Sequence, residues 1–164
     1  MSANKLPVRK PNRLKNYNYG TNGKYFLTIC AKDRLELFST IDVGAAFCRP
    51  RYTNIGRIIE KEITVLSRSY DGVSVECFVI IPNHVHMIIS IERMDGGRQD
   101  AAPTATISQM MNQWKRAVSM KVGYSVWQKS FHDHVIRDEH DYKKIAEYIE
   151  NNPYVWTEDR FYPK

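Results

Sequence analysis

The chain has 164 residues, a formal net charge of +6 and an isoelectric point near 9.2. Hydrophobic residues make up 43% and charged residues 26%, which is typical of a globular protein and excludes a disordered or fibrous chain. At this length we expect one domain that folds without a disulfide or a metal. The three cysteines show no CxxC spacing, which predicts a reducing, cytoplasmic environment. No apolar segment is long enough for a membrane span, so no membrane partner is expected.

The positive charge is concentrated at the N-terminus. Residues 1–24 contain no acidic residue and six basic ones, namely Lys5, Arg9, Lys10, Arg13, Lys15 and Lys24. We therefore divide the chain into a basic arm, residues 1–20, and a single domain, residues 21–164. Such an arm suits a polyanion, most often nucleic acid, although charge alone fits a solvated tail equally well.

The hydrophobic pattern then predicts strands and helices in alternation. A strand is expected at 24–30, a short strand or loop at 48–54, a helix at 55–69, and two strands at 72–80 and 84–92 joined by a turn at Pro82-Asn83. A polar, glycine-rich loop at 93–105 precedes a second helix with Ile107, Met110, Met111, Trp114 and Val118 on one face. A last strand at 131–137 leads to Asp138, the N-cap of a final helix that ends near Asn151, before Pro153. This order predicts an α+β, ferredoxin-like sandwich, an antiparallel sheet with helices packed on one face.

Two histidines stand at the start of the 84–92 strand, in "IPNHVHMIIS". On a strand, His84 and His86 point to one face, while Val85 and Met87 point to the other face, toward the core. Two imidazoles placed in this way can bind one divalent cation and leave coordination positions open. The spacing alone leaves three interpretations: structural histidines, a metal that serves the fold, or a metal that serves chemistry.

A second H-x-H occurs in "FHDHV", but its central residue is polar. Asp133 shares a face with Phe131 and Val135, so no apolar residue anchors the pair from behind. We interpret His132 and His134 as surface residues or neighbours of a phosphate, without a metal.

The final helix contains two tyrosines in different environments. Tyr142, Ile145, Ala146 and Ile149 follow the i, i+3, i+4, i+7 rule and form the predicted buried stripe. Tyr148 lies about 110° away from that stripe, on a polar flank with Lys144 and Asn152. A phenol is a poor nucleophile at neutral pH and needs a nearby cation or base. Tyr148 is therefore either a half-exposed packing residue or an activated nucleophile.

Four segments together resemble a known family. "YFLTIC", "FVIIPNHVHMIIS", "WQKSFHDHVIRDEHDY" and "YIENNP" follow the order and spacing of the single-tyrosine HUH transposases. The chain looks most like the REP-associated tyrosine transposases, relatives of the small transposases of IS200-like elements. The resemblance extends from about Tyr17 to Pro153.

The resemblance implies a ferredoxin-like fold and an enzyme of DNA transposition and recombination. It implies that His84 and His86 bind Mg²⁺ or Mn²⁺, with Asn152 at the position of the third ligand. It implies that Tyr148 attacks single-stranded DNA near hairpin repeats and forms a 5′-phosphotyrosine. Phosphate contacts are expected from Arg9, Lys10, Arg13, Lys15, Lys115 and Arg116, and Lys144 is expected beside the phenol. The family acts as a homodimer or a monomer.

Two other functions compete with the transposase. A domesticated module would bind hairpin DNA without cutting it, and would not need His84, His86 and Tyr148 together. A metal-dependent phosphohydrolase would use the same histidines and would need no tyrosine.

Overall fold

The computed structural model describes residues 17–42, 49–93 and 105–163. Its elements, in chain order, are β1 (Gly23–Cys30), η1 (Lys32–Arg34), β2 (Ser39–Thr40), β3 (Arg51–Tyr52), α1 (Asn54–Ser69), β4 (Val73–Ile81), β5 (His84–Ile91), α2 (Ile107–Val122), β6 (His132–Ile136), α3 (Glu139–Asn151) and η2 (Trp156–Glu158). The strands and helices expected from the sequence are present with small shifts of their ends. The short element expected at 48–54 is β3, which pairs with β2 as a separate two-stranded sheet. Most of the predicted 93–105 loop and most of the basic arm lie outside the described residues.

The main sheet confirms the predicted fold class. Its four strands are antiparallel in the order β4-β5-β1-β6, so the long first strand lies in the centre of the sheet. This is the ferredoxin-like order, in which α1 and α2 are the two connections between strands that are not hairpins.

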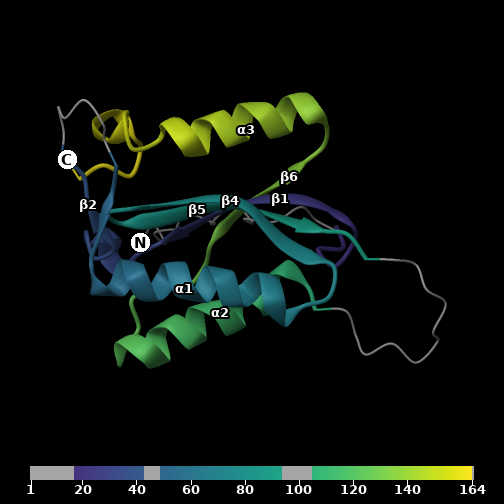
Figure 1. The fold of residues 1–164 in the computed structure, drawn as a ribbon, viewed down its shortest axis with the longest axis horizontal. Helices are drawn as coiled ribbons and strands as arrows, with labels where there is room; N and C mark the ends of the chain where they lie inside the picture. Colours follow the sequence, from purple (N-terminus) through teal and green to yellow (C-terminus); the bar gives the residue numbers. More distant parts are fainter. Residues whose placement is uncertain (1–16, 43–48, 94–104, 164) are drawn as a thin grey trace, which may run out of the picture.

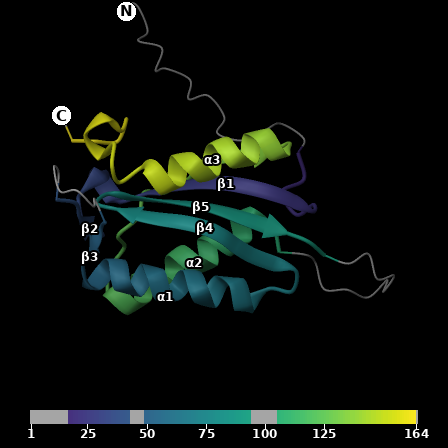
Figure 2. The ribbon, with the colours of Figure 1, turned by 45° about the horizontal axis from the view of Figure 1, so that its top comes forward.

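The helices cover both faces of the sheet. Figures 1 and 2 show α1 and α2 side by side under one face, and α3 over the other. The sequence led us to expect helices on one face, and this holds for α1 and α2. The face under α3 also carries apolar side chains, Val79, Ile81, Ile88 and Ile136, which need a cover of their own.

Strand β5 contributes to both layers by simple alternation. Val85, Met87, Ile89 and Ile91 are fully buried in the core formed with α1 and α2. His84 and His86, from the same strand, face α3 and the C-terminal segment. The predicted anchoring of the histidine pair by Val85 is therefore confirmed.

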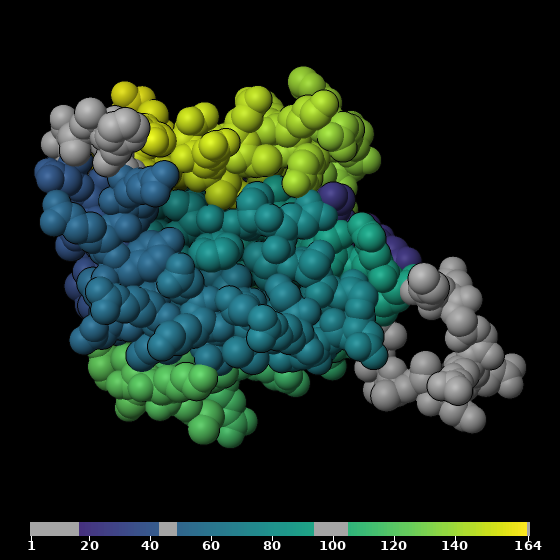
Figure 3. All heavy atoms as spheres, in the orientation of Figure 1, coloured from purple at the N-terminus to yellow at the C-terminus, as the bar shows by residue number. Residues whose placement is uncertain are grey.

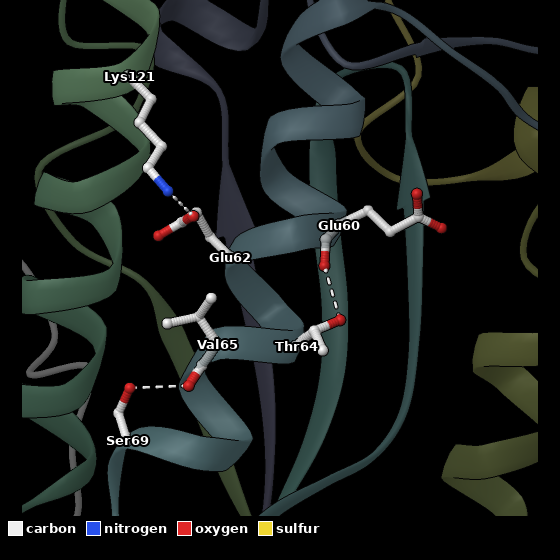
Figure 4. A network of polar contacts seen from close by, with 6 residues as sticks. All are labelled: Glu60, Glu62, Thr64, Val65, Ser69 and Lys121. Atoms are coloured by element: carbon white, nitrogen blue, oxygen red, sulfur yellow. Dashed lines mark hydrogen bonds and ion pairs between the residues drawn. The ribbon is translucent and has the colours of Figure 1, made fainter.

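A tight contact joins α1 to the segment before β2, and an ion pair joins α1 to α2. Gly56 lies so close to the Phe38 carbonyl that an added Cβ would be 2.1 Å from its oxygen. The side chain of Glu62 is only 5% exposed and pairs with Lys121 of α2 across the helix interface (Figure 4). The five apolar residues predicted for one face of α2 are all buried. No helix of the described residues has the length and apolarity needed to cross a membrane.

Helix α3 begins and packs as its sequence predicts. The Asp138 carboxylate accepts a hydrogen bond from the Asp141 amide, which caps the helix. The predicted stripe packs on the sheet, with Ile149 buried and its other three members partly buried. The space-filling view shows α3 as a ridge along the sheet, in yellow-green (Figure 3). This packing turns Tyr148 toward the start of β5.

Candidate metal and nucleophile site

The two imidazoles of the H-x-H pair meet at their Nε2 atoms. His84 and His86 are buried, and their Nε2 atoms lie 2.8 Å apart. Nδ1 of His84 lies 2.8 Å from Oδ1 of Asn83, and Nδ1 of His86 lies 2.9 Å from the Thr28 hydroxyl. Partners on the far side of each ring hold it in one orientation, as is usual for metal-binding histidines.

The hydrogen-bond partners of the two Nδ1 atoms favour unprotonated Nε2 atoms where the two rings meet. Oδ1 of Asn83 can only accept, so Nδ1 of His84 donates and its Nε2 keeps a lone pair. The Thr28 hydroxyl can accept from His86 in the same way. Burial lowers the pKa of His84 well below its usual value, and burial lowers the pKa of His86 to about 4. With the Thr28 hydroxyl accepting, both Nε2 lone pairs face each other, and a cation between them would remove their repulsion.

A carboxylate from the C-terminal segment completes the donor set. One nitrogen of each histidine and one oxygen of Asp159 all lie within 4.8 Å of one another. Within the described ranges, no other group of three or more histidine, cysteine or acidic side chains is arranged in this way. The Phe161 amide donates to Oδ1 of Asp159 at 2.7 Å and fixes the carboxylate.

Asn152, the expected third ligand, contacts this carboxylate. It is fully buried, and its Nδ2 donates to Oδ2 of Asp159 at 2.9 Å. Its Oδ1 is buried and has no hydrogen-bond partner among the described residues. One amide oxygen beside the donor set therefore keeps its lone pairs unused.

The spacing of the two histidine nitrogens fits a small divalent cation. An ion that binds its donors at about 2.1 Å in octahedral geometry has neighbouring donors about 3 Å apart. The 2.8 Å between the two Nε2 atoms is close to that value. Two imidazoles with one carboxylate suit Mn²⁺, and Mg²⁺ accepts such a set less readily because it prefers oxygen ligands.

The Tyr148 hydroxyl lies directly beside these donors. It is 3.3 Å from Nε2 of His86 and donates to Oδ2 of Asp159 at 3.2 Å. Phe26 stacks on the His86 ring and meets the Tyr148 ring edge-on. Burial, followed by the Asp159 carboxylate, raises the pKa of Tyr148 to about 12. Tyr142 is instead partly buried, with the Lys24 ammonium 4.4 Å from its ring centre.

A pocket of about 300 Å³ opens over the phenol and His86. One wall comes from β6 and includes His132, Asp133 and His134, because Thr28 lies between His86 and His132 in the strand register. His132 and His134 are exposed, as predicted, and His134 is 2.8 Å from the Asp141 carboxylate.

The cations predicted to meet DNA lie in different places. Arg116 and Lys144 are exposed, whereas Lys115 donates to the backbone carbonyls of Gln128 and Lys129. A contact of Lys115 with DNA would compete with these carbonyls. The basic residues from Arg9 to Lys15 lie outside the described part of the chain.

The sequence predictions missed Asp159 and Arg160. The cation that lowers the pKa of the Tyr148 phenol, against burial and Asp159, is the Arg160 guanidinium. Lys144, the cation predicted from helical spacing, is exposed on α3. Both missed residues follow the last predicted helix in "WTEDRFYPK", where no periodicity marks a functional element. The only signal was an acidic, a basic and an aromatic residue in succession.

Comparisons with known proteins identify two sequence relatives. No family model matches the chain. An uncharacterized protein of Haemophilus influenzae is 31% identical over 171 residues, which cover 94% of this chain and 93% of that protein. A second protein of the same organism, described as "Putative REP-associated tyrosine transposase", is 25% identical over 148 residues, covering 85% and 76% of the two chains.

A solved structure has a similar fold. It is described as a REP-associated tyrosine transposase bound to a REP hairpin, and it superposes with a TM-score of 0.62 at 22% identity. The match covers 86% of this chain and 72% of that one. The chain is thus homologous in sequence to a protein described as a putative REP-associated tyrosine transposase, and it shares the fold of a solved REP-associated tyrosine transposase.

Proposed function

We propose that the protein is a metal-dependent strand transferase that cuts single-stranded DNA near hairpin repeats through a 5′-phosphotyrosine. The observation that supports this most directly is the position of the Tyr148 hydroxyl. It lies 3.3 Å from a candidate metal-binding nitrogen of His86 and 3.2 Å from a carboxylate oxygen of Asp159. The candidate nucleophile and one candidate metal ligand, His86, thus line the same pocket.

The donor residues would hold Mg²⁺ or Mn²⁺. His84, His86 and Asp159 would be the ligands, and Asn152 would orient Asp159 or add its free oxygen. When bound, the ion would supply positive charge at the scissile phosphate. The partners of the histidine Nδ1 atoms, Asn83 and Thr28, would keep both rings aimed at it.

The chain's own residues account for the proton and the bond changes. The Tyr148 oxygen would attack phosphorus, forming a bond to the 5′-phosphate while the bond to the 3′ oxygen breaks. The phenol proton would pass to Oδ2 of Asp159, which already accepts it in a hydrogen bond. The released 3′ oxygen takes a proton from water, and its hydroxyl can later attack the phosphotyrosine and rejoin a strand.

The substrate would be hairpin-bearing single-stranded DNA. The structural relative is described as bound to a REP hairpin, and we extend that substrate class to this chain. The basic arm, Arg116 and Lys144 would add phosphate contacts, so affinity would fall as salt rises. Lys115 would join them only if it left its carbonyl partners.

A trapping experiment tests the proposal. The protein is incubated with end-labelled hairpin DNA and Mn²⁺, and covalent adducts are resolved on a denaturing gel. We expect an adduct with the wild type and with Tyr142→Phe, which alters the other tyrosine of α3. Tyr148→Phe should abolish the adduct while the DNA is still bound.

Two other outcomes would identify the competing functions. DNA that is bound by the wild type but never trapped or cut would identify a hairpin-binding module. Cleavage that persists in Tyr148→Phe would identify hydrolysis by metal-activated water.

A further inference from the structure

We propose that Arg34 and Arg160 form a phosphate clamp, an anion site that holds the backbone of single-stranded DNA at the mouth of the pocket. The inference rests on the proposed function, since it takes the anion to be a nucleic-acid phosphate. Neither arginine belongs to the predicted DNA contacts, and they are 126 residues apart in the sequence.

Both guanidiniums lie over one aromatic ring. The Cζ atom of Arg160 is 4.4 Å from the centre of the Phe161 ring, and that of Arg34 is 5.3 Å away. Phe161 is buried against the His84 ring, with centroids 4.6 Å apart. Its carbonyl accepts from Asn83, and its amide donates to Asp159. The ring that places the arginines is thus fixed to the candidate metal site.

The two arginines are available to a ligand. Both are exposed, and neither guanidinium makes an ion pair or a side-chain hydrogen bond within the described part of the chain. Phe161 and Arg160 also line the pocket that contains Tyr148. A guanidinium held on a ring keeps its N–H groups free for bidentate binding of a phosphate.

The backbone conformation at Asp33 and Arg34 is a second observation that supports an anion site here. Asp33 and Arg34 have positive φ angles of 54° and 56°, and they are the only residues other than glycine with this conformation in the described ranges. Two consecutive left-handed residues cost free energy, and such strain is concentrated at functional sites. The Lys32 amide donates to the Val126 carbonyl and holds the turn in place. The strained turn directs Arg34 to the ring of a distant segment.

The turn at residues 32–34 also borders a second pocket, which is not lined by Tyr148. Lys32 and Asp33 line a second pocket of about 530 Å³, together with Gln128 and Lys129. Arg34 directly follows these residues and reaches Phe161 of the first pocket. A strand held at Tyr148 would therefore pass the clamp and then meet Lys32 and Lys129.

Salt dependence of DNA binding tests the clamp. A fluorescein-labelled oligothymidine is titrated with the protein in EDTA, where no cleavage occurs, and anisotropy is followed at several salt concentrations. Each phosphate contact on a single strand contributes about 0.7 to the slope of log K against log salt. We expect Arg34→Ala and Arg160→Ala each to reduce that slope by about 0.7. Arg34→Lys and Arg160→Lys should keep the slope and weaken binding, because they keep the charge and lose the fork geometry.

Arg57→Ala is the matched control. Arg57 is an exposed arginine of α1, on the opposite face of the sheet, and its removal should leave the slope unchanged. Alanine variants that fold like the wild type and keep the wild-type slope would overturn the clamp, even if the Tyr148 adduct still forms. Absence of any DNA binding by the wild type would refute the proposed function and the clamp together.

Discussion

Acid should unfold the metal-free protein through its buried histidines. The pKa of His86 is lowered to about 4. Between pH 6.5 and 4, therefore, this imidazole is protonated in the unfolded chain and neutral in the folded chain. Stability from this residue is complete above pH 6.5 and is lost as the pH falls toward 4. At 1.36 kcal/mol per pKa unit, the loss from His86 is about 3 kcal/mol. His84 acts in the same direction, because its pKa is also lowered by burial.

Urea unfolding in EDTA measures this effect. We compare the wild type with His86→Gln at pH 7, 5 and 4, because glutamine fills similar space and does not titrate. The advantage of the wild type over the variant should shrink by about 3 kcal/mol across this range. His140→Gln, which alters an exposed imidazole of α3, should follow the wild type at every pH.

Stabilities of the wild type and His86→Gln that fall in parallel as the pH is lowered would refute this reasoning. If wild type and His86→Gln lose equal stability from pH 7 to 4, His86 is not held neutral by burial. Mn²⁺ supplies a second readout at pH 7. It should stabilise the wild type by mass action and have little effect on His86→Gln.

The other predictions concern the third donor, the contact of α1 with Phe38 and the ion pair between α1 and α2. Asp159→Asn should weaken Mn²⁺ binding, measured by calorimetry, by at least about tenfold, the lower end of the range for altered ligand environments; affinity equal to that of the wild type would exclude Asp159 as a ligand. Gly56→Ala should lower the free energy of unfolding by about 1–3 kcal/mol, because its Cβ would meet the Phe38 carbonyl at 2.1 Å; unchanged urea midpoints would show that the backbone yields freely. Lys121→Met should cost about 1–3 kcal/mol by leaving the Glu62 carboxylate unpaired, and Glu62→Gln in the same chain should recover most of it. A double variant as unstable as Lys121→Met would contradict that account.

Periodicity explains why most of the fold could be predicted. Val85 and Met87 alternate with His84 and His86. Because successive side chains of a strand point to opposite faces of the sheet, this alternation determines which residues face the core. The apolar faces of α2 and α3 follow from helical spacing in the same manner. The side of the sheet on which α3 packs has no local signature. It depends on the apolar side chains that β4, β5 and β6 together leave on the second face.

The candidate site likewise has residues that could be predicted from the sequence and residues that could not. His84, His86 and Tyr148 stand on regular elements, so their directions could be inferred from the sequence. Asp159 and Arg160 come from a segment after α3 whose path depends on tertiary contacts, above all the bond from Asn83 to the Phe161 carbonyl. Local pattern contains no information about such a contact. The same reasoning explains why helical spacing could indicate Lys144 as a cation near the phenol but could not indicate Arg160, which also acts on it.

The position of Asn83 links these two parts of the site. Its Oδ1 orients the His84 ring, and its Nδ2 holds the Phe161 carbonyl. One buried side chain in the turn before β5 therefore orients the His84 donor and also holds the segment that brings Asp159. The asparagine of "PNHVH" is a tight-turn residue when considered alone. In the folded chain, both ends of its amide group are used, which requires an asparagine here for a reason that turn geometry does not supply.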